Sequence, residues 1–263
     1  MERAGSIFDS HAHYDDESFD ADRDTLLAGL PDKEICCVVN CGSDLNSSRA
    51  SVELAGKYAF VYAAVGIHPE CAKDAPADYC KQLEELVTRE KVVAVGEIGL
   101  DYHFEDNAPK NVQKEIFENQ ILLAQKVGLP IIVHDRDAHG DTMEILRRRK
   151  PKGVVHCFSG SVEMAEECIR LGMYIGLGGA VTFKNARVPV EVAAAIPLER
   201  MLMETDCPYM APVPFRGKRN DSTLIAYTAA RIAEIRGTTA DEILRVSRRN
   251  AEMLFHCKGL ERS

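Results

Sequence analysis

The chain has 263 residues, of which 46% are hydrophobic and 28% charged, as in an ordinary soluble globular protein. Its 32 basic and 41 acidic residues give a formal net charge of −9, which argues against a protein that coats duplex DNA through a broad basic face. The sequence lacks an apolar run of membrane-spanning length, a signal-peptide pattern and any CxxC pair among its nine scattered cysteines. We therefore expect a cytoplasmic protein with reduced thiols and no membrane partner.

Short apolar, β-branched runs alternate with longer segments of helical pattern along the whole chain. Several of these runs are almost continuously apolar, as expected for parallel strands covered by helices. The expected strands are residues 6–9, 35–40, 60–66, 92–97, 131–134, 153–156, 174–177 and 201–204. Eight strands in strict alternation with helices predict an α/β fold, a (β/α)8 TIM barrel, formed by one domain over residues 1–263.

Two of the expected helices have clear sequence signals. In residues 111–128, one buried stripe is predicted from the spacing of Val112, Ile116, Leu123 and Val127. Gly128 is expected to end that helix. Thr239, with Glu242 three residues later, predicts a capping box at the start of the last helix.

Histidine and carboxylate side chains lie at or just after the ends of five expected strands. In a TIM barrel the C-terminal ends of all strands meet at the active site. Residues two apart on a strand point the same way, so Asp9, His11 and His13 are expected to face the barrel mouth together. The predicted metal ligands are His11, His13, Glu97, His134, His156 and Asp206.

Six nitrogen and oxygen ligands exceed the three protein ligands that one catalytic zinc ion usually has. They suit two cations about 3.5–4 Å apart with a bridging carboxylate, which we expect to be Glu97. The expected division gives one ion His11, His13 and Asp206, and the other ion His134 and His156. Asp206 is also the candidate general base, so Asp206 and Glu97 are the predicted catalytic residues. Four imidazoles favour Zn or Mn over Mg.

The segments around these residues form a recognisable set of motifs. They are DSHAH (9–13), VGIHP (65–69), GEIGLDY (96–102), PIIVHDR (130–136), HCFSG (156–160), ETDCPYMAP (204–212) and RGKRN (216–220). Together they resemble the TatD family of metal-dependent deoxyribonucleases, essentially from end to end. The resemblance implies a TIM barrel, the same six ligands, and divalent-metal-dependent hydrolysis of phosphodiesters that Mg can support. One departure is Ser222, which follows Asp221 where the family usually has proline.

Three further residues are expected to bind substrate. His68 follows the third strand and is expected to hold a phosphate, as the resemblance suggests, although it could instead cap a turn. Ser159 precedes a helix whose first N–H groups suit an anion, with Ser161 as the N-cap. Arg216 follows the eighth strand, where it could grip the backbone of a nucleic acid.

The leading hypothesis is a hydrolase that cleaves DNA phosphodiester bonds with water activated by two metal ions. The acidic balance favours single-stranded DNA or strand ends as the partner. An alternative is a two-metal hydrolase of an amide, a lactone or an aminoacyl-tRNA ester, because activated water serves all of these bonds. A third reading is a metal-storing or scaffold protein, although structural metal sites rarely extend over five strand ends.

Overall fold

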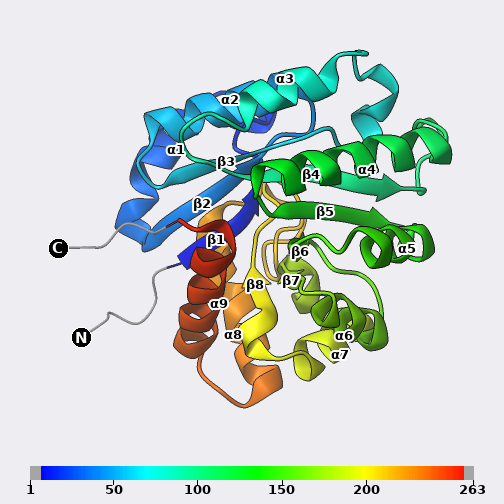
Figure 1. Cartoon of the computed structure of the whole chain (residues 1–263). Coiled ribbons are helices and arrows are strands. Elements are labelled where there is room, and N and C mark those ends of the chain that lie inside the picture. Colours follow the sequence, from blue (N-terminus) through cyan, green and yellow to red (C-terminus); the bar gives the residue numbers. More distant parts are fainter. Residues whose placement is uncertain (1–6, 258–263) are drawn as a thin grey trace.

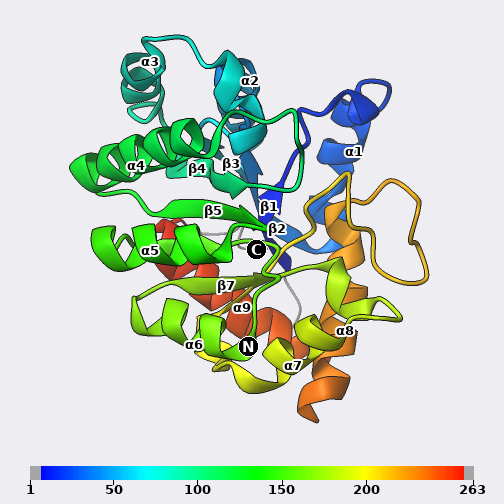
Figure 2. The ribbon, with the colours of Figure 1, turned by 90° about the vertical axis from the view of Figure 1, so that its right-hand side faces the viewer.

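The computed structural model describes residues 7–257, and in this range eight strands follow one another around a barrel in sequence order (Figures 1 and 2). Each strand is parallel to the next one along the chain. The strands are β1 Ile7–Ala12, β2 Ile35–Cys41, β3 Val61–Val65, β4 Val92–Asp101, β5 Ile131–Arg136, β6 Gly153–Val155, β7 Tyr174–Leu177 and β8 Met201–Met203. The predicted (β/α)8 barrel is confirmed.

The helices lie outside the strands (Figure 1). Those in residues 7–257 are α1 Arg23–Gly29, α2 Leu45–Lys57, α3 Tyr79–Leu86, α4 Lys110–Val127, α5 His139–Arg149, α6 Val162–Arg170, α7 Arg187–Ala195, α8 Ile225–Arg236 and α9 Ala240–Phe255. Each of α1 to α7 lies between one strand and the next, whereas α8 and α9 both follow β8. Across the described range, none of the helices combines the length and the apolar character that a membrane crossing requires.

The barrel is closed between β1 and the segment that follows β8. The N–H of Asp206 donates to the carbonyl of His11 at 2.9 Å, and the N–H of His13 donates to the carbonyl of Cys207 at 2.8 Å. These bonds hold the last residues of the barrel beside the end of the first strand. Residues nearly two hundred positions apart in the sequence are therefore neighbours.

The last helix, α9, lies beside β1 and β8 (Figure 1) and contributes to the core inside the barrel. Thr239 accepts a hydrogen bond from the N–H of Glu242, which confirms the N-cap half of the predicted capping box. The side-chain amide of Asn250 donates to two backbone carbonyls around the start of β8. At the end of the helix, Phe255 stacks on Phe8 with ring centres 6.2 Å apart. Because Phe8 lies on β1, the helix holds the strand that carries His11 from below the barrel mouth.

Helix α4 agrees with its predicted buried stripe only in part. Ile116 and Leu123 are buried, and Gly128 ends the helix with a φ of 74°. Val127, however, is 40% exposed, so the prediction was wrong for this residue. The buried side of α4 includes Gln120, whose amide bonds the backbone of the loop after β3. A pattern that counts only apolar residues misses a buried glutamine of this kind.

Several strand ends differ from those expected from the sequence. β4 continues to Asp101 and β5 to Arg136, so both strands are longer than predicted. β6 and β8 are shorter and end at Val155 and Met203. β1 continues to Ala12, beyond its predicted end at residue 9, and the predicted start at residue 6 lies outside the described residues.

Candidate metal centre

Irregular strand pairing determines where two of the predicted ligands point. Between Val95 and Ile98 of β4, three steps along the strand oppose two steps along β5, which is the pattern of a β-bulge. β1 has a similar shift relative to β2 between Asp9 and Ala12. Glu97 and His11 lie in these two stretches. Since a bulge changes the direction of the side chains around it, the alternation expected of a regular strand does not apply there.

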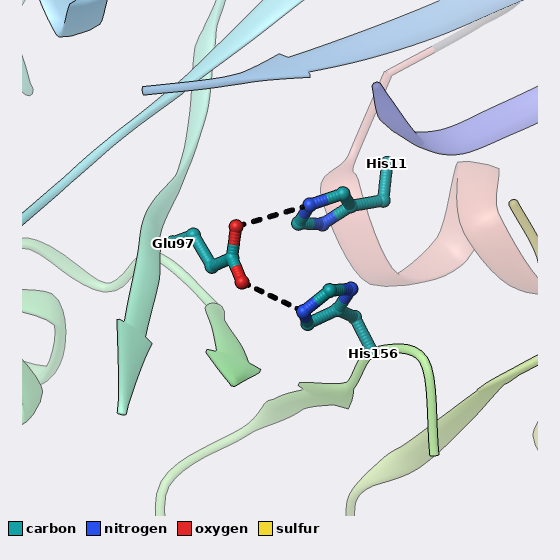
Figure 3. A group of neighbouring side chains, drawn as sticks. All are labelled: His11, Glu97 and His156. Carbon is teal, nitrogen blue, oxygen red and sulfur yellow. Dashed lines mark ion pairs between the residues drawn. The ribbon is translucent and has the colours of Figure 1, made fainter. Parts of the chain in front are cut away.

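Glu97 is the centre of the cluster. Figure 3 shows its carboxylate between His11 and His156, with a different oxygen directed at each ring. Oε2 lies 3.2 Å from Nε2 of His11, and Oε1 lies 2.7 Å from Nε2 of His156. The side chain is almost fully buried, at 5% exposure. A buried carboxylate in this position can serve two cations at once, one through each oxygen.

The ligand atoms on the Oε2 side have the spacing of a cation site. Nε2 of His11 and Nε2 of His13 are 3.0 Å apart, and Oδ1 of Asp206 lies 3.4 Å from His13 and 3.7 Å from His11. Metal–ligand bonds of about 2.0–2.1 Å in a tetrahedron place the ligand atoms roughly 3.4 Å from one another. Together with Glu97 Oε2, these atoms therefore fit one divalent cation.

The Oε1 side of Glu97 faces a second group of imidazoles. Nδ1 of His134 lies 2.9 Å from Oε1 and 3.4 Å from Nε2 of His156. His68 also belongs to this group, since its Nε2 is 3.4 Å from Oε1 and it forms a potential metal-binding set with Glu97 and His134. The structure thus brings all six predicted ligands together and adds His68. His68 follows β3 on the same face, and it is the residue that the sequence predicts to hold a substrate phosphate.

Asp101 is a functional candidate that is not among the site residues predicted from the sequence. Its Oδ2 lies 3.1 Å from Nε2 of His134, whose other ring nitrogen faces Glu97. The carboxylate is buried, and its Oδ1 accepts a hydrogen bond from the N–H of His103. A carboxylate on the second nitrogen of a ligating histidine orients the ring and fixes its tautomer. Asp101 could be recognised in the sequence only if β4 were known to continue past Glu97.

Asp9 does not face the barrel mouth with His11 and His13, so this expectation was wrong. Its carboxylate accepts hydrogen bonds from Thr205 Oγ1 at 2.6 Å and from Ser222 Oγ at 2.7 Å. Burial raises the pKa of Asp9 to about 6, although these hydroxyls act in the opposite direction. Asp9 therefore links β1 to the segment that carries Asp206. Ser222 supplies one of the links.

The charges in the cluster shift the pKa values of its histidines in both directions. Burial lowers the pKa of His11 to about 4. Burial also lowers the pKa of His13 and of His134, but their hydrogen bonds to Asp206 and Asp101, together with the charge of Glu97, raise both values to about 10. In the absence of a cation, the protons on His13 and His134 therefore stabilise the neighbouring carboxylates. Since a ligating imidazole must be neutral, a cation has to displace these protons.

Glu204 lies behind His156 as Asp101 lies behind His134. Its Oε1 is 3.8 Å from Nδ1 of His156, and both this Nδ1 and Oε2 of Glu204 are buried without a hydrogen-bond partner among the described residues. A Cβ on Gly176 would come within 2.4 Å of Oε2, so the glycine leaves the room that the carboxyl group occupies. Burial raises the pKa of Glu204 to about 8.

The Glu204→Gln substitution should make the metal-free protein less sensitive to a rise in pH from acidic to neutral values. In the folded protein the pKa of Glu204 lies above its ordinary value of 4.5, so its contribution to stability is fully present below pH 4.5 and is lost as the pH rises through about 8. Glutamine stays neutral throughout. In thermal melts with a chelator, the Tm of the variant should rise relative to wild type as the pH increases from about 4.5 to about 8, and the difference should then stay constant. Parallel Tm curves would contradict this, and the exposed Glu105→Gln change is the control.

The predicted substrate-binding residues outside the cluster lie on the same face of the barrel. Ser159 is exposed, and Ser161 caps α6 by accepting a hydrogen bond from the N–H of Met164. The guanidinium of Arg216 lies 4.0 Å above the ring of Phe183. These positions are compatible with contacts to an anionic substrate.

Comparison with known proteins identifies the family. The model of the TatD related DNase family matches residues 8–256. The chain belongs to the TatD family of metal-dependent hydrolases. It is 44% identical over 252 residues to the metal-dependent hydrolase YabD of Bacillus subtilis, covering 95% of this chain and 98% of the relative. The crystal structure of the TatD homologue YjjV from Escherichia coli K12 superposes with a TM-score of 0.90 at 32% identity and covers 97% of this chain and 100% of YjjV.

This TatD chain also resembles the metal-dependent hydrolase YcfH of Escherichia coli K12, at 37% identity over 256 residues, which cover 95% of this chain and 96% of YcfH. These relatives agree with the chemistry of the cluster, in which histidines and carboxylates form groups able to hold metal ions. The protein is therefore a metal-dependent hydrolase.

Proposed function

We propose that the protein hydrolyses phosphodiester bonds of DNA, in single strands or near strand ends, with two divalent metal ions. The observation that carries this proposal is the placement of Glu97, whose two oxygens face two separate groups of ligand atoms. The proposed ligands are His11, His13 and Asp206 for one ion and His134 and His156 for the other, with Glu97 between them. His68 lies beside the second group, where it would hold either the ion or a substrate phosphate.

Zn, Mn or Mg are the candidate metals, with the imidazole-rich set favouring Zn or Mn. When bound, such ions would polarise the phosphoryl group and make a water molecule more acidic. The proton transfer would be carried out by a side chain of the protein. Asp206 would accept the proton of the attacking water at Oδ2, because Oδ1 faces His11 and His13. The hydrogen bond from His13 holds the pKa of Asp206 below its ordinary value in spite of burial, so the carboxylate is ionised at neutral pH.

We also propose a cytoplasmic location. All nine cysteines have free thiols, and most of them are buried. Free thiols are typical of a reducing compartment, whereas secreted proteins usually contain disulfides.

The test is metal exchange combined with a set of substrates. Purified protein is stripped with a chelator, reloaded separately with Zn, Mn or Mg, and assayed on single-stranded DNA, duplex DNA, an aminoacyl-tRNA, an amide and a lactone. We expect cleavage of single-stranded DNA to disappear on stripping and to return with metal. Cleavage of the amide, the lactone or the aminoacyl ester, with none of DNA, would overturn the proposed substrate but leave the hydrolase intact.

A further inference from the structure

Arg136 is an exposed arginine at the mouth of the barrel that the chemistry above does not use. It ends β5, two residues after His134, so both side chains leave the strand on the same side. Its guanidinium lies 4.9 Å above the ring of Phe104. Among the residues that the structure describes, no ion pair includes the Arg136 side chain.

The partner ring places this guanidinium beside the metal-ligand cluster. Phe104 is 45% exposed, and it lies in the loop after β4, three residues beyond the Asp101 that contacts His134. Arg136 and Phe104 therefore lie at the ends of β5 and β4, the two strands that carry His134 and Glu97.

A similar pair lies farther around the mouth. Arg216, in the loop after β8, lies over Phe183, in the loop after β7. Arg219 of the same loop differs, since it forms an ion pair of 2.7 Å with Asp22 and is held in the structure. An arginine stacked on a ring keeps its planar edge of N–H donors free, and this edge matches the oxygens of a phosphate.

We propose that Arg136, supported by Phe104, binds a phosphate of an oligonucleotide other than the one being hydrolysed at the metal ions. This inference rests on the proposed function and narrows it. The substrate class becomes a nucleic-acid strand with at least one phosphate beyond the scissile one, held between Arg136 on one side and Arg216 on the other. A small phosphodiester with a single phosphate fills the reaction site but leaves the Arg136 subsite empty.

The test compares two substrates and three variants in the metal-loaded protein. The substrates are a short oligothymidylate and bis(p-nitrophenyl) phosphate, which contains a single phosphate. The variants are Arg136→Ala, Phe104→Leu and Arg170→Ala, the last being an exposed arginine at the end of α6. Arg136→Ala should lower kcat/KM for the oligonucleotide about ten-fold more than for the small diester, mainly through KM. Phe104→Leu should lower kcat/KM for the oligonucleotide relative to the small diester by a smaller factor. Arg170→Ala should leave the ratio of the two kcat/KM values unchanged.

Binding provides a second readout that does not depend on turnover. The affinity of the metal-loaded protein for a fluorescein-labelled phosphorothioate oligothymidylate is measured by anisotropy at several salt concentrations. Arg136→Ala should weaken binding and reduce the slope of log affinity against log salt by about 0.7, the value for one phosphate of a single strand. An unchanged slope, or an equal loss on both substrates, would overturn the assignment. If wild type cleaves neither substrate, the proposed function fails, whereas the salt slope still decides whether Arg136 contacts a phosphate.

Discussion

Replacing Glu97 with glutamine should reduce hydrolysis by about 10³-fold or more. The side chain keeps its size, but one carboxylate oxygen becomes an NH2 group that cannot bind a cation. Because the two oxygens face different ligand groups, at least one group loses its shared ligand. Bound metal should fall from about two ions per chain towards one or none, as measured by elemental analysis after gel filtration.

The control for Glu97→Gln is the same change at Glu105, an exposed residue in the loop after the same strand. It removes one negative charge near the mouth without touching the cluster, and it should retain both metal and activity. Near-normal activity in Glu97→Gln, with its full metal content, would show that this carboxylate does not bridge. Circular dichroism separates a metal effect from a failure to fold.

The Asp206→Asn variant should lower kcat by about 10² to 10⁴-fold with a smaller change in KM. Asparagine removes the ability to accept a proton but leaves an amide oxygen that can face His11 and His13. The substitution also suits the backbone, since Asp206 has a φ of 59° and asparagine tolerates the left-handed region. The measurement is steady-state kinetics on single-stranded DNA, together with the metal content of the purified variant.

Two comparisons define the role of Asp206. Asp206→Ala, which removes both the proton acceptor and the ligand oxygen, should lose metal as well as activity. If Asp206→Asn also loses its metal, Asp206 acts mainly as a ligand and a different group accepts the proton. If Asp206→Asn keeps full kcat, the residue is neither the base nor an essential ligand.

The positions of the strand ends in the sequence predict His134 and His156 as ligands, but they do not predict the carboxylates beside them. The two histidines can be predicted because they lie at the ends of strands, and the ends of parallel strands in a barrel meet at one mouth. Asp101 and Glu204 cannot be predicted in this way, because their contacts with His134 and His156 depend on the residue at which each strand ends. β4 continues through Asp101, whereas β8 ends before Glu204, and no local pattern distinguishes the two cases.

By itself, the sequence determined the barrel, its family and the six side chains that gather at its mouth. Eight apolar runs in alternation with helices are compatible with few other folds. In a parallel barrel, the C-terminal ends of the strands all lie on one face. Tertiary structure alone decided the directions of the side chains. The shifts in β1 and β4 alter the alternation around His11 and Glu97, and Asp9 is instead drawn into bonds with Thr205 and Ser222. Pairing register and barrel closure depend on contacts between segments far apart in the chain, and a local pattern does not contain them.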